Sequence, residues 1–184
     1  MASIRIGRAS RGSALIAYVL GAFVFLCGLH PLQAQGGTIS DADAKAIQSY
    51  RLTDAGLSKF MQASRNLVQV AKQHPEIAEQ EKNSDPKSLA DMEAMYDRHP
   101  EVKHAIASTG MSSRDYVLFS MAVFQAGMAA AVAEQPGGKI PDGVAPENVD
   151  FYKKHADEMK KFGEELEKSS GAVKDTSGSA ENRS

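Results

Sequence analysis

Residues 112–134 read SSRDYVLFSMAVFQAGMAAAVAE, and this stretch decides the expected fold. Ser112 and Asp115 have the spacing of a capping box, in which each side chain bonds the backbone N–H of the other residue at a helix start. Of the eighteen residues that follow Asp115, only Ser120 and Gln125 are clearly polar. A helix that is apolar on nearly every side belongs inside a protein. The stretch therefore predicts the central helix of a bundle.

A membrane-spanning helix is the alternative interpretation of this stretch, because eighteen apolar residues are close to the minimum for crossing a bilayer. Against it, the segment is rich in alanine, methionine and glycine and carries a glutamine in its middle. Ala126, Gly127, Ala130 and Ala131 make one end of the helix thin, which favours close approach of another helix. We therefore expect a helix buried by protein.

The rest of the mature chain also has helical spacing, and no alternating run of β-branched or aromatic residues predicts a strand. Besides the central helix, long helices are expected from Thr53 to just before Pro75 and from Pro146 to about Lys168. A kinked pair of short helices is expected from Asp85-Pro86 to about Arg98 and from Pro100 to Gly110, and 41–50 is a shorter lead-in helix that is not counted in the bundle. The Pro- and Gly-rich segment 135–145 predicts an extended crossover. The expected fold is all-α, a four- or five-helix bundle.

The N-terminus has the order of a secretory signal. Arg5, Arg8 and Arg11 precede an apolar run from Ala14 to Leu29, and Leu32-Gln33-Ala34 follows before Gln35. This order predicts a signal peptide at 1–34 that is cleaved after Ala34, and hence a periplasmic or secreted protein. The alternative is an uncleaved N-terminal membrane anchor, but a run of sixteen residues is short for a bilayer.

Three segments are expected in all: the signal peptide 1–34, a single helical domain 35–168 and a disordered tail 169–184. The tail contains one valine and no larger apolar side chain, so it cannot bury enough surface to fold. The only cysteine, Cys27, leaves with the signal peptide. The exported part keeps all 23 acidic residues but loses three of the 21 Lys and Arg, which leaves a net charge of −5. Such a chain does not attract nucleic acid, and after cleavage we expect no stable membrane insertion.

Four side chains are candidates for lining a ligand pocket. Ser120 and Gln125 are polar groups on the predicted central helix, and buried polar groups need partners. Tyr152 belongs to the apolar stripe of the last helix, and His155 lies one position from that stripe. Structural hydrogen bonds are the favoured explanation for Ser120 and Gln125, and a ligand pocket is the second.

Metal and cofactor signals are weak, and we expect no cofactor, no metal ligands and no catalytic residues. His74 and His99 each precede a proline, which is typical of histidines that end helices and stabilise the helix C-terminus. A bundle can hold haem between a histidine and a methionine, which would pair His155 with one of several methionines. The candidates are Met61, Met92 and Met121. No Cys-x-x-Cys-His motif, nucleophile elbow or phosphate loop occurs.

Four segments carry a resemblance: Tyr50-Arg-Leu-Thr53, Asp85-Pro-Lys-Ser-Leu89, Met111-Ser-Ser-Arg-Asp-Tyr-Val117 and Pro146-Glu-Asn-Val-Asp-Phe-Tyr152. Together they resemble a group of small exported bacterial α-helical proteins without assigned function, a domain of unknown function, over about residues 48 to 167. The resemblance implies an exported helical domain without a recognised catalytic motif. It implies no activity.

The sequence thus predicts an exported, non-enzymatic helical module that binds a periplasmic or envelope protein or a small apolar ligand. A haem- or metal-binding bundle is one alternative. An enzyme whose site is dispersed along the chain, around His155, is the other.

Overall fold

The computed structural model describes residues 40–81 and 84–176, and these residues form seven helices and no strand. The helices are α2 (Asp41–Ser49), α3 (Asp54–Gln73), α4 (Pro75–Glu81), α5 (Leu89–Asp97), α6 (Pro100–Ala107), α7 (Ser113–Ala133) and α8 (Pro146–Thr176). The all-α class expected from the sequence is confirmed for this part of the chain. The predicted signal peptide 1–34 lies outside the described residues.

The helix that the sequence places at the centre is at the centre. α7 packs against α8, α5, α2, α3 and α6. Its Phe119 is completely buried and stacks on Phe60 of α3, with ring centroids 4.9 Å apart. Tyr116 also stacks on Phe60, at the same centroid distance. These aromatic rings, rather than aliphatic side chains alone, hold α7 against α3.

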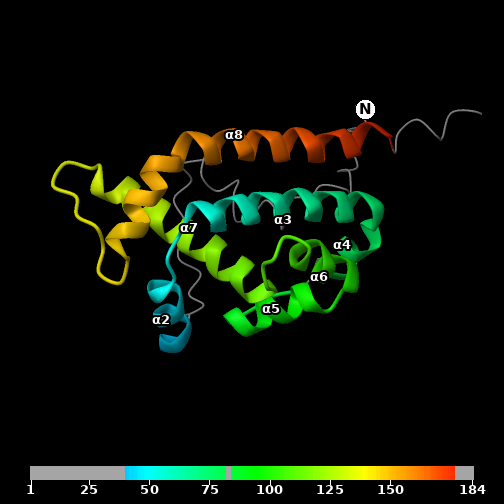
Figure 1. The fold of residues 1–184 in the computed structure, drawn as a ribbon, viewed down its shortest axis with the longest axis horizontal. Helices are drawn as coiled ribbons and strands as arrows, with labels where there is room; N and C mark the ends of the chain where they lie inside the picture. Colours follow the sequence, from blue (N-terminus) through cyan, green and yellow to red (C-terminus); the bar gives the residue numbers. More distant parts are fainter. Residues whose placement is uncertain (1–39, 82–83, 177–184) are drawn as a thin grey trace, which may run out of the picture.

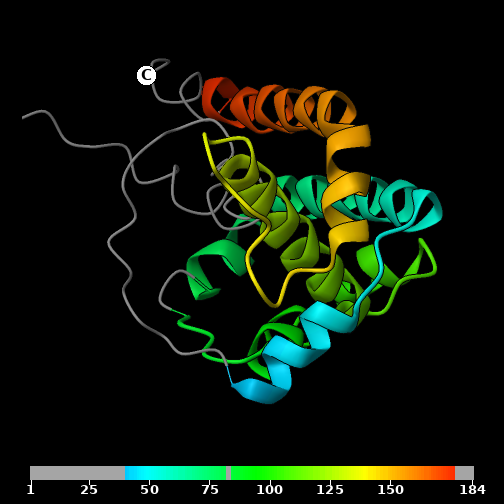
Figure 2. The ribbon, with the colours of Figure 1, turned by 90° about the vertical axis from the view of Figure 1, so that its left-hand side faces the viewer.

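The helices lie in layers on both sides of α3 and α7. Figure 1 shows α8 running along one side of α3, with α5 and α6 on the other side. In the turned view, α2 and the C-terminal half of α8 lie on opposite sides of the molecule, with α3 and α7 between them (Figure 2). The first helix of the described chain and the last helix therefore cover different sides of the central layer.

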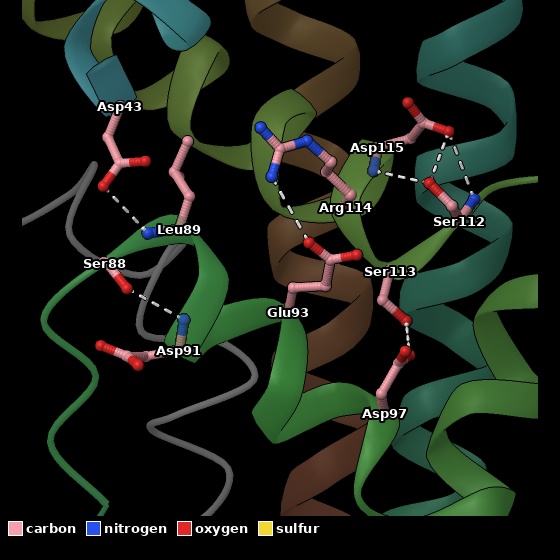
Figure 3. A network of polar contacts seen from close by, with 10 residues as sticks. All are labelled: Asp43, Ser88, Leu89, Asp91, Glu93, Asp97, Ser112, Ser113, Arg114 and Asp115. Carbon is pink, nitrogen blue, oxygen red and sulfur yellow. Dashed lines mark hydrogen bonds and ion pairs between the residues drawn. The ribbon is translucent and has the colours of Figure 1, made fainter.

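The caps read from the sequence are formed. The Ser112 hydroxyl accepts from the Asp115 N–H at 3.0 Å, and Asp115 Oδ2 accepts from the Ser112 N–H at 3.3 Å (Figure 3). Thr53 Oγ1 accepts from the Gly56 N–H at the start of α3. Gly110 has a φ of 76°, the left-handed conformation expected of a glycine that stops a helix. The boundaries of α3 and α7 therefore follow from interactions within four residues.

The structure confirms that α3 ends before Pro75, adds one helix that was not expected and corrects two boundaries. Pro75 itself opens the added helix, α4, since proline is tolerated at a first helical position. α5 begins at Leu89 and is capped by Ser88, not by Asp85. α8 continues past Lys168 to Thr176, so the disordered tail expected from residue 169 does not begin there; residues 177–184 lie outside the described residues.

Two local reasons explain these corrections. Ser170 is buried and donates its hydroxyl hydrogen to the Leu166 carbonyl at 2.8 Å, so this serine bonds back to its own helix instead of ending it. The expected count of four or five helices becomes seven in the described residues because short segments such as α4 form separate helices.

The segment between α7 and α8 forms neither helix nor strand over residues 135–145, as its Pro and Gly content predicts. It is not a simple extended crossover, because its Ile140 and Val144 pack back on Ala129, Ala130 and Val149. The segment therefore closes one side of the C-terminal end of α7.

Candidate functional site

His155 of α8 lies between two carboxylates. Its Nδ1 is 2.8 Å from Glu158 Oε2, and its Nε2 is 2.7 Å from Asp54 Oδ1, the first residue of α3. The contact to Asp54 lacks hydrogen-bond geometry, although Nε2 is buried. The imidazole side chain is only 12% exposed and lies against the Phe151 ring, with centroids 4.4 Å apart. Both ring nitrogens therefore face carboxylate oxygens.

Lys154 completes this cluster. Its Nζ lies 3.3 Å from Asp54 Oδ1, and the hydrogen bond and charge of Lys154 lower the pKa of Asp54 below its ordinary value. The Asp54 carboxylate thus contacts both the Lys154 ammonium group and the His155 imidazole of α8. The arrangement is typical of a link between two helices, here the start of α3 and the third turn of α8.

Tyr152, one turn before His155, fills the space over Gly127 of α7. A Cβ atom built on Gly127 would lie 2.9 Å from Tyr152 Cε2, closer than real side chains approach. The close helix approach expected at Gly127 is therefore present, and Tyr152 uses it. Ala126 and Ala130 are buried as expected, whereas Ala131 is exposed and takes no part in this contact.

Ser120 and Gln125, the two polar candidates on α7, are half-buried and not fully enclosed. Ser120 donates its hydroxyl hydrogen to the Val117 carbonyl of its own helix at 2.8 Å. None of the contacts recorded for His155 involves Ser120 or Gln125. The four candidate residues therefore divide into two pairs on different helices, with Tyr152 and His155 together on α8.

A second polar cluster was not anticipated from the sequence. Glu81, at the end of α4, is 8% exposed; its Oε1 accepts from Arg98 at 2.6 Å and lies 2.9 Å from His99 Nε2. Its Oε2 accepts from the Ser84 hydroxyl at 2.5 Å. No spacing rule brings these residues together, because they come from the end of α4, the segment after it and the α5–α6 junction.

The electrostatics of Glu81 indicate a structural role. Burial raises the pKa of Glu81, but the hydrogen bonds from Ser84, His99 and Arg98 outweigh it and hold the pKa below its ordinary value. A carboxylate kept ionised by three donors is a poor proton acceptor. His99 was expected to end a helix and stabilise its C-terminus, but its ring instead contacts Glu81. His74 does lie at the C-cap of α3, as expected.

Metal ligation and tyrosine chemistry find no support in these groups. Within 40–81 and 84–176, no group of three or more His, Cys, Asp or Glu side chains is placed to hold a metal ion.

The Tyr116 hydroxyl lies 3.0 Å from Ser64 Oγ, and burial raises the pKa of Tyr116 to about 12. This tyrosine is therefore neutral at physiological pH and part of the core.

The most distinctive surface lies on α7. At its N-terminal half, Val117, Leu118 and Met121 pack against Ile47 of α2 and Leu89 of α5. About two and three turns beyond Met121 on the same side, Met128 is 50% exposed and Val132 is 44% exposed. Phe124 and Gln125, which lie between Met121 and Met128, are half-buried. We call Phe124, Gln125, Met128 and Val132 the open face of α7, and Val117, Leu118 and Met121 its covered face.

α7 is also long and apolar enough to cross a membrane, judged by length and composition alone. In this fold, however, 56% of its most apolar window is buried by the other helices. Burial of that extent is expected for the core helix of a folded bundle. Together with Ala131, the open face is the apolar part of α7 that the other described helices leave to solvent.

Two of the segments that carry the sequence resemblance meet in the fold. Asn148 is 4% exposed, and its side-chain amide accepts from the Leu52 N–H at 3.0 Å and donates to the Tyr50 carbonyl at 2.9 Å. A single buried amide therefore satisfies two backbone groups of the α2–α3 linker from the first turn of α8. These segments have a structural function in this chain.

The other two segments each take part in the polar contacts drawn in Figure 3, with different partners. Ser113 donates to Asp97 at 2.6 Å, and Arg114 reaches Glu93 at 3.4 Å, which joins the start of α7 to α5. Asp43 of α2 accepts from the Leu89 N–H at 3.4 Å. Polar groups thus fix α2 and α5 beside the covered face of α7.

No known protein family, curated protein or solved structure matches this chain.

Proposed function

We propose that this chain is an exported, non-enzymatic interaction module that binds a protein partner through the open face of α7. The observation that carries the proposal is the exposure of Met128 and Val132, one turn apart on the helix that is otherwise the most buried in the bundle. Exposed apolar side chains that lie together are typical of protein interaction sites.

The composition of the open face suits a protein partner. Methionine is flexible and polarizable, so Met128 adapts to a partner's surface at low cost. Gln125 on the same face supplies a donor and an acceptor for hydrogen bonds at the edge of the contact. A helix laid along α7 would place its own apolar residues against these positions at spacings of three and four.

Export is proposed on the order of charged, apolar and small residues before Gln35. The signal peptide would be cleaved after Ala34, which leaves the helical domain in the periplasm or outside the cell. The partner would then be a periplasmic or envelope protein.

The arrangement of the candidate polar groups favours a binding function over the alternatives. A histidine that serves as a haem ligand or general base needs one nitrogen that its ligand or substrate can reach. Nε2 of His155 makes no hydrogen bond, but it is buried and lies 2.7 Å from Asp54 Oδ1, and Nδ1 lies 2.8 Å from Glu158 Oε2. Ser120 bonds to its own helix. These contacts leave no activated nucleophile at the positions from which a dispersed active site was hypothesised.

The proposal is tested by photo-cross-linking in the periplasm of an expressing bacterium. A photoreactive amino acid at position 128 is expected to capture one discrete protein, whereas the same group at the exposed Lys161 of α8 is not. The double variant Met128→Ser/Val132→Ser should lose the same partner in a pull-down. Equal or absent capture at positions 128 and 161 contradicts the proposal.

Native mass spectrometry of residues 35–184 from the same periplasm is the complementary measurement. A bare chain with a partner bound through position 128 supports the proposal. A retained small molecule, with no protein bound, would instead favour the apolar-ligand interpretation and reject the protein partner.

A further inference from the structure

The ring of His155 lies between carboxylates from two helices. Nε2 lies 2.7 Å from Asp54 Oδ1 at the start of α3, and Nδ1 lies 2.8 Å from Glu158 Oε2 of α8. The imidazole is 12% exposed and packs on the Phe151 ring. α7 also packs against α8, but in the described part of the chain it contributes no charged or titratable group to the contacts of this ring. The acids that act on His155 therefore come from α3 and α8.

These two short distances call for a hydrogen on each ring nitrogen. A neutral imidazole carries one N–H, and its other nitrogen presents a lone pair. A lone pair at 2.7 or 2.8 Å from a carboxylate oxygen is repelled, whichever nitrogen carries it. The imidazolium ion instead places a hydrogen on both nitrogens and a positive charge between two negative ones. The geometry is thus that of a protonated histidine.

The contact to Asp54 is the one that depends on the second proton. Nδ1 and Glu158 have hydrogen-bond geometry, so a neutral ring keeps its single N–H on Nδ1. Nε2 is buried and has no hydrogen-bond partner, so a neutral ring leaves a lone pair against Asp54 Oδ1. The Asp54 side chain is 70% exposed and is free to turn into water, whereas the ring is held by its burial. Loss of one proton therefore releases the contact to α3 and retains the contact to Glu158.

Asp54 stays ionised over the range in which a histidine changes its charge. The hydrogen bond and charge of Lys154, followed by the charge of His155, hold the pKa of Asp54 below its ordinary value. Carboxyl groups ordinarily titrate near pH 4, and histidine is the side chain that ordinarily changes its charge between about pH 5 and 8. Of the three groups at this contact, only the imidazole therefore changes its charge in that range.

We propose that His155 is a proton-dependent clamp between α3 and α8, which holds Asp54 while both ring nitrogens carry a hydrogen and releases it when Nε2 loses its hydrogen. The stabilising contribution of the clamp is present at the acidic end of the range, where the ring is charged, and is lost as the pH rises toward 8. The start of α3 is thus held on α8 more firmly in acid than in alkali. This inference does not depend on the partner surface of α7.

A double-mutant cycle on the full chain separates this contact from the other groups that titrate. Urea unfolding is measured at pH 5 and pH 8 for the wild type, His155→Gln, Asp54→Asn and the double variant. We expect the two substitutions to be coupled by at least about threefold in the unfolding equilibrium constant at pH 5 and to be additive at pH 8. The matched control is the cycle of His74→Gln and Glu76→Gln, because His74 meets this one carboxylate at 3.0 Å and its ring is 36% exposed.

The coupling at pH 5 should exceed that of the control cycle. Coupling no larger than the control, or of equal size at pH 5 and pH 8, overturns the clamp. Nitrogen NMR of the labelled imidazole tests the tautomer directly: above pH 8, the remaining hydrogen of His155 should be on Nδ1. A hydrogen on Nε2 instead would overturn the inference, because the contact to Asp54 would then survive deprotonation.

Discussion

The two halves of α7 have similar composition and different surroundings. In the first half, Leu118 is 8% exposed and Val117 is 3% exposed, because α2 and α5 lie on them. In the second half, Met128 and Val132 on the same side are 50% and 44% exposed. Both halves are apolar in sequence, so hydrophobicity alone does not decide burial. What differs is whether another helix is fixed beside each half.

Polar contacts explain why α2 and α5 cover only the first half of this side of α7. Ser113, Arg114 and Asp43 join α5, α7 and α2 near the start of α7, as Figure 3 shows. No comparable contact among the described residues fixes a helix over the second half of that side. The lesson is that an apolar face becomes core only where neighbouring elements are positioned on it.

The largest expected effect is on the covered half. Leu118→Ala should lower the free energy of unfolding by about 2 to 5 kcal/mol, because it removes buried methyl groups and leaves a cavity between α7, α2 and α5. Urea unfolding followed by circular dichroism measures it. A loss below about 1 kcal/mol would mean that α2 and α5 are not firmly held on α7, and the comparison between the halves would fail.

Gly127→Val tests the other contact of the second half, which faces α8. The new side chain would meet the Tyr152 ring, where even a Cβ atom lies 2.9 Å away, and we expect a destabilisation of about 1 to 3 kcal/mol. In the double variant with Tyr152→Leu, part of this loss should be recovered in a double-mutant cycle. Additive effects would show that the two residues do not share this contact.

Ser113→Ala tests the polar contact that fixes α5. The Asp97 pKa lies below its ordinary value because of the hydrogen bond from Ser113, followed by the bond from Lys103. Loss of the Ser113 bond should cost about 0.5 to 1.5 kcal/mol at pH 7.

The pH dependence has a defined sign. A lowered folded-state pKa contributes stability that is present above the unfolded value, near 4, and is lost as the pH falls through the folded value. The difference between wild type and Ser113→Ala should therefore shrink below about pH 4. Guanidinium unfolding at pH 7 and pH 3 measures it, and a difference that is equal at both pH values argues against the Asp97 contact.

The smallest expected effect is on the open face. Met128→Ser/Val132→Ser should change the free energy of unfolding of the mature chain by no more than about 0.5 kcal/mol per site, because both side chains are half in water. Partner binding should be lost all the same. A thermal melt that shifts as far as that of Leu118→Ala would show that the open face is core, and the distinction between the halves would disappear.

Much of the fold could be predicted because its signals are local. The Ser112 and Asp115 cap, the Thr53 cap and the stop at Gly110 involve residues within four positions of each other. The errors came where local signals compete. Pro75 is equally compatible with a helix end and a helix start, and Ser170 is able to bond its own helix instead of ending it.

The candidate site was less predictable, for a physical reason. His155 and Tyr152 were singled out from their spacing on one helix, but their partners Asp54 and Gly127 lie far away in the chain. The Glu81 and His99 contact joins residues from different elements, so no periodicity indicates it. Sequence spacing identifies polar side chains near a core and does not identify what they meet.

The sequence by itself determined that the described chain is helical, that α7 is its central helix and where the main caps lie, because these properties depend on side-chain period and on interactions within one turn. Only the tertiary structure decided which half of α7 is covered, that both nitrogens of His155 face acids, and that Asn148 holds the α2–α3 linker. These outcomes depend on contacts between segments distant in the chain, where chain entropy and packing, not local spacing, select the neighbours.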